Sequence, residues 1–149
     1  MMNDKIIVAL DTQNEDKLNF LISELKGSAS FVKIGMELFY TYGPDIVKKL
    51  KGEGFKIFLD LKLHDIPQTV HNSCQTLAKL DIDILNVHAA GRMNMMRQAY
   101  KGYRELNESG KLIAVTQLTS TDQEPLKSQI GIDTDINEVI VAYAKLTQQ

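Results

Sequence analysis

Residues 55–67 read Phe-Lys-Ile-Phe-Leu-Asp-Leu-Lys-Leu-His-Asp-Ile-Pro, a nearly apolar run that ends in a group of charges. Residues 55–61 are almost continuously apolar, which is typical of a strand covered on both faces in a parallel sheet. Asp60 and Lys62 stand two positions apart at the end of this run, so their side chains point to the same side. The run therefore brings two opposite charges to one place.

Four further apolar runs have the same character, at residues 6–10, 31–34, 82–87 and 112–118. Amphipathic segments follow each of the five runs and carry apolar residues at helical spacing, represented by Leu18 and Ile22, Val47 and Leu50, Val70 and Cys74, Met95 and Ala99, and Val139 and Tyr143. The chain thus repeats a strand and a helix five times. Such repeats predict an α/β fold with a parallel sheet and right-handed crossovers.

Two architectures fit these repeats, a doubly wound open sheet and a (β/α)8 TIM barrel. No Gly-x-Gly-x-x-Gly motif follows the first run, as a dinucleotide-binding doubly wound domain would have. Instead, Asp11, Lys33 and His88 end other runs, as Asp60 and Lys62 end theirs. Reactive groups at the ends of several strands favour the barrel, although periodicity alone leaves the choice open.

The length of the chain limits how much of a barrel it contains. A complete (β/α)8 barrel has roughly 200 residues or more, whereas this sequence has 149. We therefore expect residues 1–149 to form one incomplete barrel domain, with about the first five of its eight units. Such a piece leaves the edges of its sheet unpaired.

The composition indicates an ordinary globular protein, with 44% apolar residues, 24% charged residues and a net charge of −2. This charge provides no broad basic field, so we expect no nucleic-acid partner. No apolar stretch approaches the roughly 20 residues that span a bilayer, and no signal-peptide pattern is present. We expect a cytoplasmic protein without a membrane partner, in which the single cysteine, Cys74, is a small apolar residue of a helix.

The charges around residue 60 form an alternating set of Lys33, Asp60, Lys62 and Asp65. Flanking carboxylates keep lysines protonated, and flanking lysines keep carboxylates ionised. A fixed anion at Asp60 would favour the loss of a neighbouring substrate carboxylate as CO2, and Lys62 would protonate the resulting carbanion. This chemistry requires no metal and no organic cofactor. A purely structural ion-pair network is the alternative that charge spacing leaves open.

Residues 60–67, Asp-Leu-Lys-Leu-His-Asp-Ile-Pro, resemble the D-x-K-x-x-D-I-P signature of the orotidine 5′-phosphate decarboxylases. Residues 7–11, 31–39, 86–91 and 114–121 resemble further segments of that family, in the same order. The resemblance implies a (β/α)8 barrel enzyme of pyrimidine nucleotide synthesis that needs no cofactor. It would convert orotidine 5′-phosphate to UMP and CO2.

The resemblance also implies a role for each matched residue. Asp11 would bind the ribose hydroxyls, and Lys33 would bridge the ribose and Asp60. Asp60 would lie against the orotate carboxylate, and Lys62 would donate a proton to C6 of the pyrimidine.

Other implied roles depend on a second subunit or on the ring of the substrate. The family forms homodimers with shared active sites, so Asp65, Ile66 and Thr69 would complete the site of the partner. Thr119 would contact the pyrimidine. The family's lid loop and phosphate-binding arginine belong to later barrel units, so we expect little or no activity from the 149-residue chain alone.

Two alternatives remain beside the orotidine enzyme. Magnesium-dependent 3-keto-L-gulonate 6-phosphate decarboxylases and hexulose-phosphate synthases share the D-x-K-x-x-D pattern, but residues 65–67 and 118–121 favour the orotidine enzyme. The chain would otherwise be an inactive fragment that only dimerises.

Three histidines and one glycine complete the set of residues with a predicted role. The spacing of His64, His71 and His88 predicts no metal site. We expect His64 to orient the loop that holds Asp65, and His88 to line the ribose region. Gly91 is predicted to adopt a positive φ in a tight turn.

Overall fold

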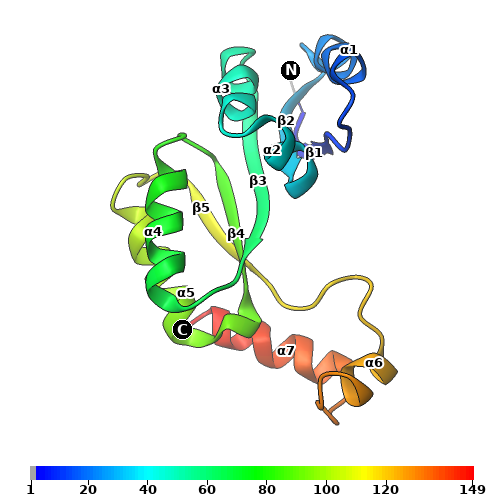
Figure 1. Ribbon diagram of the computed structural model, residues 1–149, viewed down its shortest axis with the longest axis vertical. Helices are drawn as coiled ribbons and strands as arrows, with labels where there is room; N and C mark the ends of the chain where they lie inside the picture. The colour runs from blue at the N-terminus through cyan, green and yellow to red at the C-terminus, as the bar shows by residue number, and fades with distance from the viewer. Residues whose placement is uncertain (1–2) are drawn as a thin grey trace.

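The computed structural model describes residues 3–149, which form a single five-stranded parallel sheet. The strands are β1 (Asn3–Ala9), β2 (Ala29–Gly35), β3 (Lys56–Leu63), β4 (Ile84–His88) and β5 (Lys111–Val115). Each strand pairs with the next one in the chain, so the sheet order is β1-β2-β3-β4-β5. A doubly wound sheet reverses its order at a switch point, whereas a barrel adds strands in sequence. The curled sheet of Figure 1 is therefore part of a barrel.

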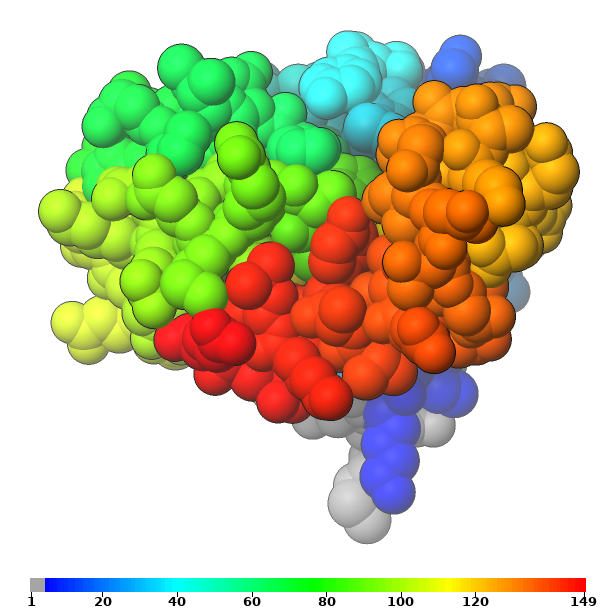
Figure 2. All heavy atoms as spheres, turned by 90° about the horizontal axis from the view of Figure 1, so that it is seen from below, coloured from blue at the N-terminus to red at the C-terminus, as the bar shows by residue number. Residues whose placement is uncertain are grey.

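Seven α-helices and one 3-10 helix are described between and after the strands. They are α1 (Glu15–Leu25), α2 (Met36–Tyr42), α3 (Asp45–Gly52), α4 (Pro67–Ala78), η1 (Ala89–Gly91), α5 (Arg92–Arg104), α6 (Gln123–Ser128) and α7 (Ile136–Thr147). The five predicted amphipathic segments lie in α1, α3, α4, α5 and α7, whereas α2 and α6 were not predicted. Figure 2 shows α7 in red between α5 and α6. None of the helices within residues 3–149 has the length and apolar character needed to cross a membrane.

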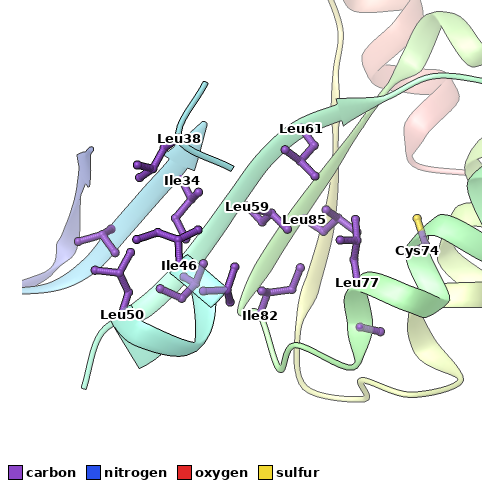
Figure 3. Close-up of a cluster of buried hydrophobic side chains, with 14 of the residues drawn as sticks. Ile34, Leu38, Ile46, Leu50, Leu59, Leu61, Cys74, Leu77, Ile82 and Leu85 are labelled. Carbon is purple, nitrogen blue, oxygen red and sulfur yellow. The ribbon is translucent and has the colours of Figure 1, made fainter. Parts of the chain in front are cut away.

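The hydrophobic core lies between the sheet and its connecting helices. Figure 3 shows Ile34, Leu59 and Leu85, which come from three adjacent strands and are fully buried. They belong to the same cluster as side chains of the helices, which include Ile46, Val47 and Leu50 of α3 and Val70, Cys74 and Leu77 of α4. Each large apolar side chain buried in this way contributes about 1.5–3 kcal/mol relative to an exposed one. Cys74 is fully buried on α4, which confirms its interpretation as a small apolar residue of a helix, and burial raises the pKa of its thiol to about 12.

The outer strands correct the expectation that every run is buried on both faces. Ile6 of β1 is 53% exposed, and Ile113 of β5 is 42% exposed. These two strands form the edges of the sheet, so each pairs with a neighbour on only one side. The last run is also shorter than predicted. It ends at Val115, which pairs with His88, because β4 itself ends there.

Helices α4 and α5 pack closely against each other at Gly102 of α5. A Cβ atom at this glycine would lie far inside van der Waals contact with the backbone carbonyl oxygen of His71 on α4. The next residue, Tyr103, is fully buried, and its hydroxyl donates a hydrogen bond to the carbonyl oxygen of Ile82 at 2.7 Å. The small size of Gly102 thus sets the distance between the two helices.

We predict that Gly102→Ala lowers the free energy of unfolding by about 1–3 kcal/mol, because the backbone of α4 must shift to make room. The matched control is Gly52→Ala in α3, where a Cβ atom would meet no atom within 4 Å. That variant should equal or exceed the stability of the parent, since alanine favours helices by about 1 kcal/mol over glycine. Urea denaturation of the three proteins measures both effects. Equal midpoints for Gly102→Ala and Gly52→Ala would contradict the packing described here.

Candidate active site

A cluster of four charged side chains lies at the carboxyl ends of β1, β2 and β3. The Nζ atom of Lys62 lies 2.6 Å from Oδ1 of Asp60. The Nζ atom of Lys33 lies 3.3 Å from Oδ2 of Asp60 and 3.6 Å from Oδ1 of Asp11. The structure therefore brings Lys33, Asp60 and Lys62 together, as the sequence predicts, and it adds Asp11 to them. Asp60 is buried at the centre of the cluster, whereas Asp11 is exposed at its edge.

The backbone of β3 is irregular where it carries Lys62. Leu59 pairs with Leu85 of β4, and the next pair in the ladder joins Leu63 to Val87. Four positions along β3 thus match two along β4, so β3 holds two extra residues. Lys62 lies among them with a φ of 51°, in the left-handed region that costs a non-glycine residue about 1–3 kcal/mol. Strain of this kind persists only where the surrounding structure imposes it, which marks Lys62 as a candidate functional residue.

Asn86 of β4 connects Asp60 to the backbone of Lys62. Its Nδ2 atom donates a hydrogen bond to Oδ1 of Asp60 at 2.7 Å, and its Oδ1 atom accepts one from the backbone N–H of Lys62 at 2.8 Å. Sequence reasoning assigned no role to this residue. The available signal was a lone amide side chain inside the apolar strand Ile84–His88, since a buried amide requires hydrogen-bonding partners.

The surroundings of Asp60 determine its charge. Burial raises the pKa of Asp60, but hydrogen bonds from Lys62 and Asn86 and the positive charges of Lys62 and Lys33 outweigh it. The pKa of this carboxyl therefore lies below its ordinary value of 3.8, and Asp60 is an anion at neutral pH. The charge pattern of the sequence predicts the same ionisation state.

His88 lies beside this cluster at the end of β4. Burial lowers its pKa below the ordinary value of 6.5, and the charges of His64 and Lys62 lower it further against the opposing effect of Asp60. The rings of His64 and His88 have centroids 5.7 Å apart. His71 lies apart from them on α4, where its Nδ1 atom is 3.2 Å from the carbonyl oxygen of Gln98. Within residues 3–149, no group of three or more His, Cys, Asp or Glu side chains is placed to hold a metal ion.

Asp65 does not join the cluster within one chain, which corrects the predicted set of four alternating charges. It is exposed in the turn before α4, where its Oδ1 atom accepts a hydrogen bond from the backbone N–H of Ile66 at 2.6 Å. No ion pair within the described residues joins Asp65 to Lys33 or Lys62. The chain leaves the sheet after Leu63, so the position of Asp65 is set by the turn and not by strand β3.

The remaining predicted substrate-binding residues lie on exposed segments. Ile66 and Thr69 are exposed at the start of α4. Thr119 is exposed in the stretch that leads from β5 to α6 (Figure 1). Their predicted contacts with substrate stay predictions.

Gly91 corrects another expectation. Its φ is −67°, and the positive φ of this turn, 68°, belongs to Arg92. A Cβ atom at position 91 would meet the end of the flexible Met95 side chain, which would have to move aside.

The family model described as "Orotidine 5'-phosphate decarboxylase / HUMPS family" matches residues 4–149. The chain belongs to this family. The match covers all five strands apart from Asn3 at the start of β1, together with the four clustered charges and Asn86.

Proteins of the orotidine 5′-phosphate decarboxylase / HUMPS family provide similar sequences and a similar fold. A protein of Staphylococcus haemolyticus named orotidine 5′-phosphate decarboxylase is 50% identical over 148 residues, which are 99% of this chain and 64% of that protein. A protein of Bacillus mycoides with the same name is 48% identical over 152 residues, with the same two coverages. The chain thus spans 64% of the length of these relatives.

A solved structure confirms the barrel architecture. The crystal structure of orotidine 5′-phosphate decarboxylase from Lactobacillus acidophilus superposes with a TM-score of 0.89 and is 43% identical. The similarity covers 96% of this chain and 66% of that one. The five-stranded sheet is therefore part of a TIM barrel of this family.

We predict that Asp60→Asn lowers the free energy of unfolding at pH 7, because the two lysines lose the carboxylate between them. The pKa of Asp60 is lowered in the folded chain, so its stabilising contribution is fully present above the ordinary pKa of 3.8 that the carboxyl has in the unfolded chain. That contribution is lost as the pH falls through the lowered folded pKa. The stability difference between parent and variant should therefore shrink toward acid pH in urea denaturation.

The control for this pH dependence is Asp45→Asn. Asp45 pairs with Lys48 on the surface of α3, where both side chains are exposed. Exposed pairs contribute little, so this variant should follow the parent at every pH. A difference for Asp60→Asn that stays constant from pH 7 to below pH 4 would contradict the lowered pKa of Asp60.

Proposed function

We propose that the chain supplies the reaction centre of an orotidine 5′-phosphate decarboxylase, which forms UMP and CO2 in pyrimidine synthesis. The observation that carries the proposal is the position of Asp60, an anion held between the ammonium groups of Lys62 and Lys33 at 2.6 and 3.3 Å. The names of the two curated relatives support this choice of substrate.

The proposed reaction uses the opposite charges of Asp60 and Lys62. The substrate carboxylate at C6 lies against Asp60, and the repulsion between the two anions favours departure of neutral CO2. The C6–carboxyl bond breaks, and its electron pair stays on C6. Lys62 stabilises this developing charge and then transfers a proton from Nζ to C6, which completes UMP. These interactions are stronger in the transition state than in the ground state, as catalysis requires.

The substrate ribose would lie on the other side of Asp60. Lys33 bridges Asp60 and Asp11 in the structure, so a ribose bound by Asp11 would lie within reach of the same ammonium group. Lys33 would then hold Asp60 ionised and orient the sugar. Thr119 would contact the pyrimidine from the segment after β5.

We further propose that the active enzyme is a cytoplasmic homodimer with shared sites. Asp65, Ile66 and Thr69 stand exposed on one turn at the start of α4, and Ile66 is 67% exposed. In the dimer, Asp65 would approach Lys62 of the partner and complete the alternating charges. An exposed large apolar side chain beside it is suited to a contact between subunits.

A second candidate is a magnesium-dependent sugar-phosphate decarboxylase or synthase. The observation in its favour is the family model itself, whose description includes HUMPS as well as the orotidine enzymes. The Staphylococcus haemolyticus relative, which is 50% identical to this chain, is named orotidine 5′-phosphate decarboxylase, and this name favours the first candidate.

The test is the turnover of orotidine 5′-phosphate, followed by absorbance, with and without EDTA. The chain is assayed alone and mixed with the C-terminal part of the Staphylococcus haemolyticus relative, because the chain spans 64% of that protein. We expect little turnover by the chain alone, and turnover in the mixture that EDTA does not change. Lys62→Ala should lower this turnover by about 100-fold or more, the usual contribution of a general acid.

The control variant is Lys48→Ala, which removes an exposed lysine whose partner is Asp45 and should leave turnover unchanged. Loss of turnover in EDTA would favour the magnesium-dependent candidate. A mixture that binds and dimerises but never releases CO2 would overturn the proposed activity.

A further inference from the structure

The geometry points to Asn86 as a positioning residue, which fixes the carboxylate of Asp60 and the backbone of Lys62 relative to each other. This inference rests on the proposed function, in which Asp60 and Lys62 act on the same carbon of the substrate. Asn86 is 2% exposed and lies behind the charged pair, so it acts through these residues and not on the substrate.

The hydrogen bonds of Asn86 permit only one orientation of its amide. Nδ2 faces a carboxylate oxygen of Asp60, and Oδ1 faces the backbone N–H of Lys62. Rotation of the amide by 180° would place two acceptors together at Asp60 and two donors together at Lys62. Asn86 therefore binds the carboxylate of Asp60 and the backbone N–H of Lys62 at the same time, each with a different atom of its amide.

The bond to Lys62 replaces a missing interaction of the sheet. The β3–β4 ladder is interrupted between the pair at Leu59 and the pair at Leu63, so no residue of β4 is matched to Lys62. The backbone N–H of Lys62 donates instead to the side chain of Asn86. This bond supports the positive φ of Lys62, a conformation that is costly for a lysine.

The bond to Asp60 selects how its carboxylate is presented. Oδ1 of Asp60 accepts hydrogen bonds from Nδ2 of Asn86 and Nζ of Lys62. Oδ2 is therefore directed toward Nζ of Lys33. Asn86 itself is anchored by strand pairing, because it is matched to Ile113 in the regular β4–β5 ladder. The positions of Asp60 and Lys62 are thus fixed by a residue of the sheet and not by the exposed loops around it.

Two variants test this role in the complemented enzyme. Asn86→Leu removes both hydrogen bonds at similar volume. Asn86→Asp keeps the shape and the acceptor but replaces the donor that faces Asp60, so it serves if Asn86→Leu fails to fold. The matched control is Asn107→Leu, since Asn107 is also buried and bonds to Ile82 and Gly110 at the other end of the strands.

The first readout is the titration of the Asp60 carboxyl carbon by NMR, and the second is kcat and KM. We expect Asn86→Leu to raise the Asp60 midpoint by about one pH unit or more, through loss of a hydrogen bond to the charged form. We expect kcat to fall by about 100-fold, as for a reacting group displaced by 1 Å, with KM little changed. Asn107→Leu should change stability alone.

Asn86→Asp should give a distinctive pH profile. The two neighbouring carboxyls would share one proton with a raised apparent pKa, and the singly protonated pair resembles the parent. Turnover of this variant should therefore be retained at low pH and lost as the pH rises through that pKa. A purely structural role for Asn86 would lower turnover equally at every pH.

The two proposals fail in different ways, because the NMR titration needs no turnover. If the parent mixture binds and dimerises but does not decarboxylate the substrate, the proposed function is overturned, and the titration of Asp60 still tests the role of Asn86. If Asp60 titrates in both Asn86 variants as it does in the parent, the positioning role is overturned whatever the activity.

Discussion

The structure of the site depends on keeping the carboxylate of Asp60 charged in a buried position. An isolated anion at this depth would lose the hydration that stabilises it, and an unpaired buried charge is strongly destabilising. Two ammonium groups and one amide compensate for that loss, at 2.6, 3.3 and 2.7 Å. All three partners come from β2, β3 and β4, so the sheet must hold its register for the carboxylate to remain an anion.

The parallel sheet makes this concentration of charge possible. Strands that run in the same direction and in sequential order bring their carboxyl ends to one rim, which is where barrel enzymes place their catalytic groups. Gly35 pairs with Asp60, so the end of β2 lies beside the centre of the site. A Cβ atom on Gly35 would lie 3.6 Å from Nζ of Lys33, so this position adjoins the lysine. The irregular step in β3 then turns Lys62 toward the same carboxylate.

The sequence predicted those features that depend on local patterns. Strand-helix repeats predicted the parallel sheet, and the spacing of Asp60 and Lys62 predicted their contact. Features that depend on register were not predicted, since no local pattern reveals which residue of β4 lies opposite the extra residues of β3. Asn86 was therefore missed. Asp65 lies in the loop after β3, as predicted, but the spacing of the charges did not reveal that this loop keeps it away from Lys33 and Lys62 of the same chain.

Helix α2 and the edge strands show other limits of local reasoning. Residues 36–42 form a short helix that ends at Gly43, whose φ is 63°, and seven residues are too few for a clear helical period. The burial of β1 and β5 depends on what lies beside them in space, which an apolar run does not specify.

The site is tested most directly by an NMR titration with millimolar UMP of the 15N-labelled chain, mixed with the C-terminal part of the Staphylococcus haemolyticus relative. We expect shift changes at the amides of Lys62 and Lys33 and of their strand neighbours, with the largest where β3 departs from its register with β4. In a mixture whose two parts associate, changes confined to α6 and α7, or no change at any of these amides, would contradict the proposal that the nucleotide binds at the rim of β2, β3 and β4.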